Sequence, residues 1–165
     1  MINGKRVLAV IPARSGSKRC PGKNFLPYRR KRLVDWAWEA ASGSRYIDRI
    51  ILSLDADRPP ELCTDDATCE DVLRYHAAQA PHDWLVLLQP TSPNRTAEDI
   101  DKTIEKAVLN GDGAISTYHY KTNGAVYVAT PAWLAEHEFS HAGLAKYEMD
   151  ESHSLDIDHL EDFLK

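Results

Sequence analysis

The stretch VLAVIPARSGSKRCPGKN, residues 7–24, decides the fold. Residues 7–11 are continuously apolar, a pattern that predicts a short buried strand of a parallel sheet. The loop that follows carries two glycines and four cations: Arg14, Lys18, Arg19 and Lys23. Glycine lets backbone N–H groups approach a ligand closely, and fixed cations match the charge of a polyphosphate. The loop therefore predicts a phosphate-binding site, although four cations without the strand and the glycines would favour a solvated basic loop.

Two common phosphate-binding motifs are excluded by the spacing of this loop. A Walker A loop requires G-x-x-x-x-G-K-[ST], but Gly16 and Gly22 are one residue too far apart, and Asn24 stands where that motif has its hydroxyl residue. The dinucleotide motif G-x-G-x-x-G is absent from the sequence. The loop is therefore predicted to bind phosphate in another way.

Short apolar segments alternate with helical patterns along the rest of the chain. Strands are predicted at residues 6–11, 46–54, 84–88, 114–117 and 125–129, and helices at 33–42, 67–79, 96–110 and 159–165. This alternation predicts an α/β protein of one domain, residues 1–165, with a mostly parallel central sheet and helices on both faces. Ligands of such sheets bind beyond the carboxyl ends of the strands, so the loops at 12–24 and 89–95 are expected to converge on one crevice.

Two of the predicted helices carry capping signals. Thr96 is expected to cap the helix at 96–110, with Asp99 three residues later as in a capping box, and Gly111 is expected to end it. Asp158 can cap the last helix, where Glu161 occupies the third position.

The bulk composition limits the remaining function classes. The 165 residues are 43% hydrophobic and carry a formal net charge of -5, which argues against a nucleic-acid-binding surface. The three cysteines form no CxxC pair, and the seven histidines show no zinc-ligand spacing. The first apolar run is too short for a secretory signal or a membrane span. We therefore expect a cytoplasmic protein without nucleic-acid or membrane partners.

Five segments form an ordered set: IPARSGSKRCPGKN at 11–24, RPPELCTDDAT at 58–68, LLQPTSPNR at 87–95, NGAVYV at 123–128 and SLDID at 154–158. In this order and from end to end, the set resembles the cytidylyltransferases that make CMP-linked nonulosonic acids, such as the CMP-sialic acid synthetases. The related Kdo cytidylyltransferases are expected to carry GKP where this chain has GKN. The segments GKN and LQPTSP therefore favour the sialic-acid-like branch.

The resemblance implies a Rossmann-like fold of the nucleotide-diphospho-sugar transferase type. It also implies a reaction, in which CMP passes from CTP to the anomeric hydroxyl of an acidic nine-carbon sugar and pyrophosphate leaves. Mg²⁺ is the implied cofactor, and a homodimer is the implied assembly.

The first two segments are assigned to the nucleotide by this resemblance. The residues expected to bind CTP are Arg14, Ser17, Lys18, Lys23, Asn24, Arg58, Thr68 and Cys69. Arg14 and Lys23 are also expected to be catalytic, because fixed cations stabilise charge that builds on the phosphates in the transition state. Where the family often has a serine, this chain has Cys69, and a thiol is a poorer hydrogen-bond partner. Asp65 and Asp66 have the alternative role of favourable charge at a helix N-terminus.

The sugar is expected to contact Gln89 and Asn123. Gln89 ends an apolar strand and so projects into the crevice. Asn123 opens a strand whose start faces the sugar in the family. Arg95 has two alternatives, a substrate anion or the nearby Asp99.

A metal site is expected at Asp156 and Asp158. They are separated by one residue in an extended pattern, which puts both carboxylates on the same face. Two carboxylates suit Mg²⁺, which takes few protein ligands and keeps water and phosphate oxygens. The alternative is that Asp158 only caps the last helix.

Two connections are shorter than those of the family. Little chain separates Asp55 from Arg58, and the dimerisation excursion expected between Thr117 and Asn123 is shortened or missing. A parallel crossover needs a dozen or more residues, so either the chain is a cut-down version or segments are missing from it. The second alternative is favoured, because deleting a dimer arm would expose apolar surface. Two rival functions stay open: a nucleotidyltransferase for another acid sugar such as Kdo, and a CTP-binding paralogue without catalysis.

Overall fold

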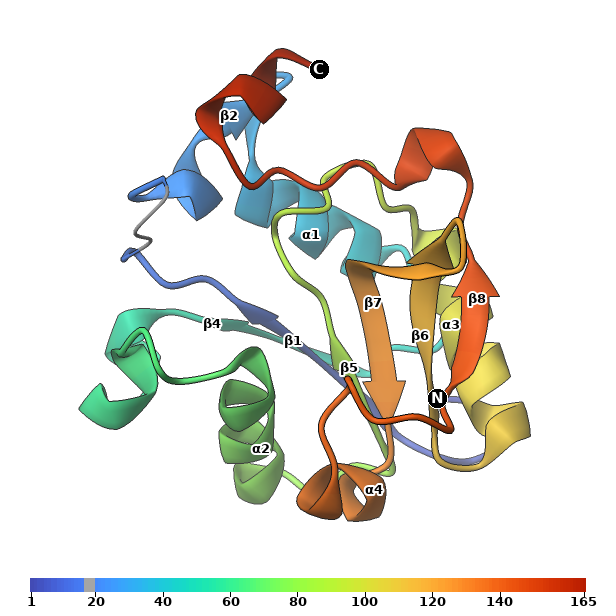
Figure 1. Ribbon diagram of the computed structural model, residues 1–165. Coiled ribbons are helices and arrows are strands. Elements are labelled where there is room, and N and C mark those ends of the chain that lie inside the picture. The colour runs from blue at the N-terminus through green and yellow to red at the C-terminus, as the bar shows by residue number, and fades with distance from the viewer. Residues whose placement is uncertain (17–19) are drawn as a thin grey trace.

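A computed structural model describes residues 1–16 and 20–165 of the chain (Figure 1). Ser17, Lys18 and Arg19 of the predicted phosphate loop lie outside the described residues, so the roles assigned to them stay predictions. The described residues form a six-stranded sheet between two layers of helices, with a separate two-stranded sheet beside it.

The six-stranded sheet has the order β4-β1-β5-β7-β6-β8. Its strands are β1 (Val7–Pro12), β4 (Arg49–Ser53), β5 (Trp84–Leu87), β6 (Gly113–Tyr118), β7 (Lys121–Ala129) and β8 (Ala145–Glu148). β1 runs parallel to β4 and β5, and β8 runs parallel to β6, whereas β7 is antiparallel to β5 and β6. The predicted α/β architecture with a mostly parallel sheet is confirmed.

Helices cover both faces of this sheet, as predicted. α1 (Leu33–Ser42) and α3 (Ala97–Asn110) pack on one face, and α2 (Cys69–Gln79) and α4 (Pro131–Glu136) pack on the other (Figure 1). Along β1 the side chains alternate between the two layers: Val7, Ala9 and Ile11 face α1 and α3, and Leu8 and Val10 face α2 and α4. All five are fully buried. The continuous apolar run at 7–11 is thus explained by a strand that is covered on both faces.

The remaining elements are short. The two-stranded sheet consists of β2 (Pro27–Tyr28) and β3 (Lys31–Arg32). Short 3-10 helices lie at Lys23–Phe25, Asp55–Asp57, Pro60–Cys63, Glu151–His153 and Leu160–Leu164. The last of these packs near β2 and the start of α1, since Phe163 contacts the small buried cluster of Tyr28, Leu33 and Ile157.

The capping box of α3 is confirmed. The Oγ1 of Thr96 accepts from the N–H of Asp99 at 3.2 Å, and the carboxylate of Asp99 accepts from the N–H of Thr96 at 2.8 Å. Gly111, with φ 93°, ends the helix as predicted. Thr68 caps α2 in the same way with Asp71, so the helix predicted at 67–79 begins at Cys69.

The predicted cap of the last helix is wrong. Instead of a helix at 159–165 that is capped by Asp158 with Glu161 in support, the chain forms a 3-10 helix over Leu160–Leu164. Its capping carboxylate is Asp162, which accepts from the N–H groups of Asp158 and His159 at 3.0 and 2.9 Å. The side chain of Asp158 is therefore available for contacts elsewhere.

The sequence reasoning missed α4 and β8. α4 is only six residues long, too short for a helical period, although Thr130 caps it and Pro131 occupies its first turn. β8 lies at the edge of the sheet, and its residues alternate between intermediate and exposed. The strand expected at 46–54 begins only at Arg49.

The connection at 118–121 is a tight hairpin. β6 and β7 are antiparallel and pair from Gly113–Ala129 to Tyr118–Lys121. Both turn residues, His119 and Tyr120, have positive φ, at 48° and 62°, as in a type I′ turn. The chain needs no parallel crossover at this place, because an antiparallel pair needs only two residues to turn. After β4, the chain passes through 3-10 helices into α2, which provides the parallel crossover to β5.

Candidate functional site

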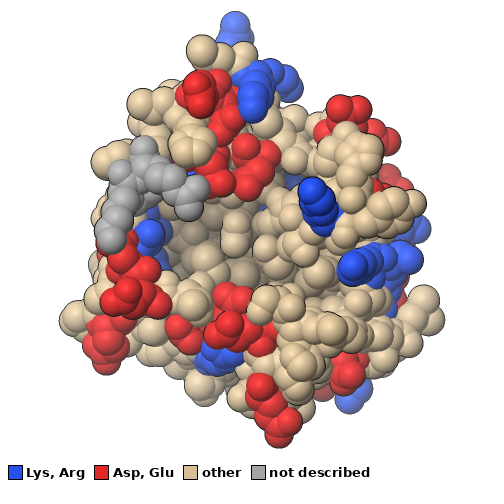
Figure 2. Space-filling view, viewed as in Figure 1, with Lys and Arg blue, Asp and Glu red and all other residues tan. Residues whose placement is uncertain are grey.

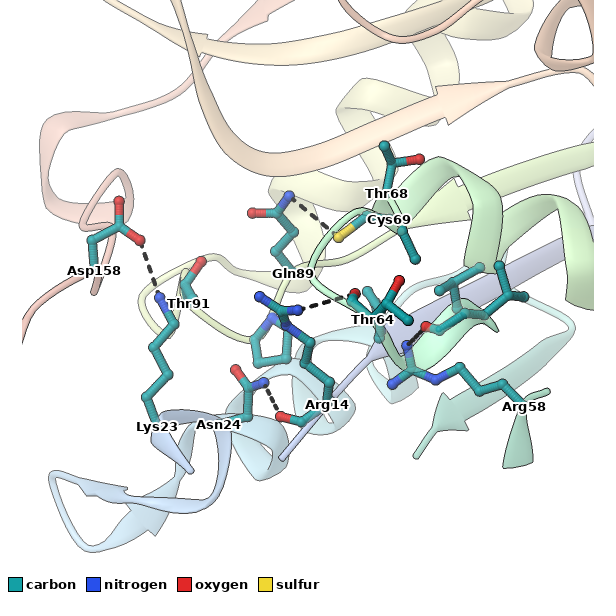
Figure 3. A pocket seen from close by; sticks show the side chains of 15 residues that line it. Arg14, Lys23, Asn24, Arg58, Thr64, Thr68, Cys69, Gln89, Thr91 and Asp158 are labelled. Carbon is teal, nitrogen blue, oxygen red and sulfur yellow. Dashed lines mark hydrogen bonds and ion pairs between the residues drawn. The ribbon is translucent and has the colours of Figure 1, made fainter. Parts of the chain in front are cut away.

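A cavity of about 320 Å³ lies at the carboxyl ends of β1, β4 and β5 (Figure 3). Figure 2 shows the hollow on this face, with acidic and basic side chains around it. The predicted site residues that line it are Arg14, Lys23, Asn24, Arg58, Thr68, Cys69, Gln89 and Asp158. All of them except Cys69, which directly follows the second segment, come from four of the five segments of the ordered set. The expected convergence of the strand-end loops is therefore observed.

Arg14 follows β1 and points into the cavity (Figure 3). Its Nη1 donates to Asp65 Oδ1 at 2.9 Å and to the carbonyl of Thr64 at 3.3 Å. Both partners of this ion pair are partly exposed to solvent, and such pairs contribute only about 0–1 kcal/mol. A phosphate ligand can therefore replace Asp65 as the partner of Arg14 at little cost.

Lys23 links the predicted phosphate loop to the SLDID segment. Its ammonium donates to Asp158 Oδ1 at 3.0 Å and to the carbonyl of Ile157 at 3.1 Å, and only 13% of its side chain is exposed. The cation and the predicted metal ligand thus meet at the edge of the cavity (Figure 3).

Asn24 is buried in the same loop. Its Nδ2 donates to the carbonyl of Arg14 at 3.1 Å. This hydrogen bond joins the two ends of the loop. Asn24 also lines the cavity, and its expected contact with CTP stays a prediction.

Asp55 anchors the start of the predicted phosphate loop, a role that sequence reasoning missed. Its Oδ2 accepts from the backbone N–H of Ser15 at 2.9 Å and also from the Ser15 hydroxyl. Partial burial acts to raise the pKa of Asp55, but the hydrogen bonds from Ser15 and the charge of Arg58 outweigh it and lower that pKa. A carboxylate directly after a strand, opposite a glycine-bearing loop, is the signal that could have pointed to this anchor.

Arg58 lines the cavity but uses most of its donors on its own loop. Its guanidinium donates to the carbonyls of Ser53, Leu54 and Leu62 and to Asp55 Oδ1, at 3.2 to 3.4 Å. A guanidinium has five N–H groups, so one remains for a ligand. The main role of Arg58 in this structure is therefore to stabilise the loop that forms the cavity wall (Figure 3).

Thr68 and Cys69 start α2 at the cavity wall. The Thr68 hydroxyl is engaged in its cap with Asp71. The Cys69 thiol lies 4.0 Å from Gln89 Nε2, and burial raises its pKa to about 11. The thiol is therefore protonated at neutral pH and offers only a weak hydrogen bond. In the described part of the chain Cys69 and Cys63 form no disulfide.

A second cavity of about 580 Å³ adjoins the first, and Gln89 lines both. The predicted residues Asn123 and Asp156 lie in this second cavity, with the β6–β7 hairpin on one side. Asn123 is already well bonded: its Oδ1 accepts from Ser116 Oγ at 2.6 Å, and its Nδ2 donates to Ser154 Oγ at 3.3 Å. Gln89 is thus the predicted sugar contact with more freedom to meet a ligand.

The two predicted metal ligands flank Ile157, which is fully buried. Asp156 is exposed as a residue, but partial burial of its carboxylate raises its pKa, and the nearby charge of Asp158 raises it further, against a hydrogen bond from Thr91 that lowers it. In the described part of the chain no three His, Cys, Asp or Glu side chains gather into a metal-binding group. The pair therefore fits a divalent cation that also takes phosphate and water oxygens, since such a cation would relieve the repulsion between the two carboxylates.

In the described ranges 1–16 and 20–165, no helix is both long and apolar enough to cross a bilayer.

The strand order and the cavity at the carboxyl ends define an α/β protein with the nucleotide-diphospho-sugar transferase fold. A family model described as cytidylyltransferase matches residues 8–63. An N-acylneuraminate cytidylyltransferase of Escherichia coli is 30% identical over 213 residues, which cover 96% of this chain and 50% of that protein. A CMP-N,N'-diacetyllegionaminic acid synthase of Legionella pneumophila is 28% identical over 211 residues, which cover 93% of this chain and 91% of that protein. These matches confirm the resemblance to CMP-sialic acid synthetase-like cytidylyltransferases.

Similarity to a Kdo enzyme is more local. A 3-deoxy-manno-octulosonate cytidylyltransferase of Synechococcus elongatus is 39% identical over 56 residues, which cover 34% of this chain and 23% of that protein. The chain spans about half the length of the E. coli relative. The alignment with that relative runs over 213 residues, more than the 165 of this chain, so the relative has segments that are absent here.

Solved structures share the fold. CMP:2-keto-3-deoxy-manno-octonic acid synthetase complexed with CTP superimposes with a TM-score of 0.69 at 15% identity, covering 87% of this chain and 90% of that one. Rv0371C of Mycobacterium tuberculosis, in a complex with manganese, superimposes with a TM-score of 0.67 at 19% identity and covers 96% of both chains. The shared fold therefore extends over almost the whole of both chains.

Proposed function

We propose that this protein is a cytidylyltransferase that transfers CMP from CTP to the anomeric hydroxyl of a nonulosonic acid. The observation that carries the proposal is the pair of adjoining cavities that share Gln89. One holds the cations Arg14 and Lys23, and the other holds Asp156 and Lys121 beside neutral hydrogen-bonding groups. A nucleoside triphosphate and an acidic sugar can therefore lie side by side with their reacting atoms near Gln89.

When CTP binds, its phosphates replace the carboxylates that pair with the cations of the first cavity. Arg14 leaves Asp65 and Lys23 leaves Asp158, and both then neutralise the α-phosphate and the departing pyrophosphate. Arg14 can hold two oxygens at once, whereas Lys23 acts as a point charge. Little covalent work falls to the protein, so most of the rate comes from positioning and charge stabilisation.

The Asp156 and Asp158 carboxylates would hold the divalent cation, for which we propose Mg²⁺. When bound, the cation supplies charge neutralisation at the phosphates and orients the attacking oxygen. In this role Asp158 exchanges its contact with Lys23 for one with the cation. The same event therefore delivers a cation to the phosphate and an anion to the metal site.

The sugar would lie in the second cavity, with its hydroxyl groups against the amide of Gln89. The extent of the matches favours a nonulosonic acid over Kdo: the sialic and legionaminic acid relatives match over at least 93% of this chain, the Kdo relative over 34%. A cytoplasmic homodimer is part of the proposal.

Pyrophosphate release from CTP tests the function. The assay contains Mg²⁺ and a panel of sialic, legionaminic and pseudaminic acids with Kdo, and it compares the wild type with Asp156→Ala. Release with one nonulosonic acid, abolished in the variant, supports both the reaction and the metal site. Measurable CTP binding without release for any sugar would favour the non-catalytic paralogue instead, and release with Kdo alone would move the assignment to that branch.

A further inference from the structure

The ladder between β5 and β7 stops where the sugar cavity begins. These antiparallel strands pair at Leu85–Ala129, Val86–Val128 and Leu87–Tyr127. Continued by two positions, the same register would place Gln89 opposite Ala125. No such pairing occurs between them in the described structure, since β5 ends at Leu87 and the ladder stops at the Leu87–Tyr127 pair. The opening of the cavity is therefore an opening of the sheet itself.

The guanidinium of Arg95 lies in this gap. Its Nη1 donates to the carbonyl of Gln89 at 3.0 Å and to the carbonyl of Ala125 at 2.6 Å. These are the two residues that the strand register would have placed opposite each other. Arg95 is only 3% exposed, so one buried nitrogen joins the separated strand ends without closing the cavity.

This bridge lies directly behind the predicted sugar contacts. Gly124 precedes Ala125, has φ 77°, and a Cβ built on it would lie 3.4 Å from Gln89 Oε1. The amide of Gln89 therefore lies against the backbone of Gly124. A change in the separation of the two carbonyls would move the Gln89 side chain relative to Asn123 and Gly124 in the wall of the second cavity.

Neither of the two roles considered for Arg95 explains its contacts. The Asp99 carboxylate is occupied by Thr96, His153 and Tyr147. Within residues 1–16 and 20–165, the Nε and Nη2 of Arg95 have no hydrogen-bond partner and are closed to solvent, so a substrate anion does not reach them. Burial lowers the pKa of Arg95 to about 10, which leaves it charged at neutral pH.

We infer that Arg95 is a positioning residue: it holds the ends of β5 and β7 at a fixed separation and thereby sets the place of Gln89 in the sugar cavity. The role in sugar binding rests on the proposed function, but the bridge between the strands does not. Gln89 lines both cavities, but the residues predicted to bind CTP lie on other segments. A change at Arg95 should therefore affect sugar affinity more than CTP affinity.

Two variants and a control test this inference. Arg95→Met keeps a long side chain but donates no hydrogen bond, and Arg95→Lys keeps a cation that can donate to both carbonyls. Removing a poorly partnered buried charge offsets part of the loss of two hydrogen bonds, so Arg95→Met is expected to fold. The control is Arg74→Met, because Arg74 also donates to two carbonyls, those of Leu134 and His137, but on the α2–α4 side of the sheet.

Backbone hydrogen exchange tests the bridge without any substrate. In Arg95→Met, amides of residues 122–126 should exchange about tenfold faster than in the wild type, whereas amides at 127–129, which stay in the ladder, should be unchanged. In Arg95→Lys, the exchange rates of these amides should lie between those of Arg95→Met and the wild type. Unchanged exchange at 122–126 in a folded Arg95→Met protein would overturn the bridge, as would an equal acceleration in the Arg74→Met control.

Steady-state kinetics test the consequence for the sugar. Arg95→Met should raise the KM for the sugar about tenfold and leave the dissociation constant of CTP within about twofold, with partial recovery in Arg95→Lys. Equal losses for CTP and sugar, or no change in the sugar KM, would overturn the positioning role. If the wild type turns over no acid sugar, the proposed function fails, and the exchange experiment still decides the bridge.

Discussion

The ammonium of Lys23 lies 3.0 Å from Asp158 Oδ1, although 135 positions separate the two residues in the chain. The contact joins the loop after the first strand to the SLDID segment near the end of the sequence. It also pairs a predicted phosphate ligand with a predicted metal ligand. In the proposed reaction, both residues have to exchange this contact for a new partner.

Neutralising Asp158 should therefore separate metal binding from phosphate binding. In Asp158→Asn, Lys23 loses its charged partner, and CTP should bind about threefold more tightly than in the wild type when no divalent metal is present. The enhancement of CTP affinity by Mg²⁺ should disappear. Calorimetric titration with and without Mg²⁺ measures both effects. The exposed neighbour Glu161 provides the control, as Glu161→Gln, and an unchanged Mg²⁺ enhancement in Asp158→Asn would exclude Asp158 as a metal ligand.

Asp156 should limit the stability of the free protein. Its pKa is raised by burial and by the charge of Asp158, so its ionised form costs the folded state stability at pH values above that raised pKa. Asp156→Asn should increase the thermal midpoint at pH 7 and should lose this advantage below about pH 4, where the carboxyl is protonated in both states. Calorimetric melting at the two pH values checks it, and a lower midpoint for the variant at pH 7 would contradict the assigned repulsion.

The affinity for Mg²⁺ should depend on the ionisation of Asp156. Because a carboxylate binds a cation only when ionised, the apparent affinity for Mg²⁺ in the presence of CTP should fall on acidification from pH 7. The fall should begin at a higher pH than an ordinary Asp with a pKa of about 3.9 would give. A titration series in Mg²⁺ between pH 5 and 8 measures it, with CTP binding in the absence of metal as the reference. An affinity that is flat down to pH 5 would argue against Asp156 as a ligand.

The Asp55 anchor should matter for both stability and CTP. In Asp55→Ala, the N–H of Ser15 loses its acceptor, and we expect a loss of about 1 kcal/mol in the free energy of unfolding at pH 7. The pKa of Asp55 is lowered in the folded protein, so this contribution is present above its ordinary pKa and vanishes as the pH falls through the folded value. Urea denaturation at neutral and acid pH tests the sign.

The same variant should bind CTP about tenfold more weakly, because the loop that carries Arg14 is no longer held against β4. Asp57→Ala is a suitable comparison, since Asp57 lies in the same 3-10 helix and, among the described residues, its carboxylate accepts from the N–H of Leu54 and not from Ser15. Equal CTP affinity of both variants would contradict the anchoring role.

Cys69 tests the wall of the nucleotide cavity. Its thiol is protonated at neutral pH, with a pKa raised to about 11 by burial. Cys69→Ser offers a stronger hydrogen-bonding group at the same place and should tighten CTP binding about twofold to fivefold. Cys63→Ser is the matched control, because Cys63 is bonded to the carbonyls of Asp55 and Pro59 and does not line the cavity. Weaker CTP binding by Cys69→Ser would show that the thiol packs and does not contact the nucleotide.

Local signals in the sequence predicted the parts of the fold that local physics determines. α1 has the predicted bounds, and the Thr96–Asp99 cap fixes the start of α3, because a capping box and a helical period lie within a few residues. The strand at residues 7–11 was recognised because burial on both faces leaves a continuous apolar run. The convergence of Arg14, Lys23 and Gln89 followed from the rule that parallel strands end at one edge.

Contacts between distant segments could not be predicted in this way. Nothing near Asp158 indicates that it pairs with Lys23 and that Asp162 caps the turn in its place. The bridge of Arg95 to Ala125 depends on the antiparallel direction of β7, which residue patterns do not encode. The contact of Asp55 with Ser15 likewise depends on the pairing of β4 with β1, which the sequence near Asp55 does not indicate.

The most direct test of the central claim is the product of the reaction. Protein, CTP and Mg²⁺ are incubated with each nonulosonic acid, and the mixture is analysed by mass spectrometry and phosphorus NMR. We expect one CMP-linked sugar, joined through the anomeric oxygen by a single phosphodiester, and an equal amount of pyrophosphate. Recovery of intact CTP with every acid sugar, from a protein that binds CTP, would contradict it.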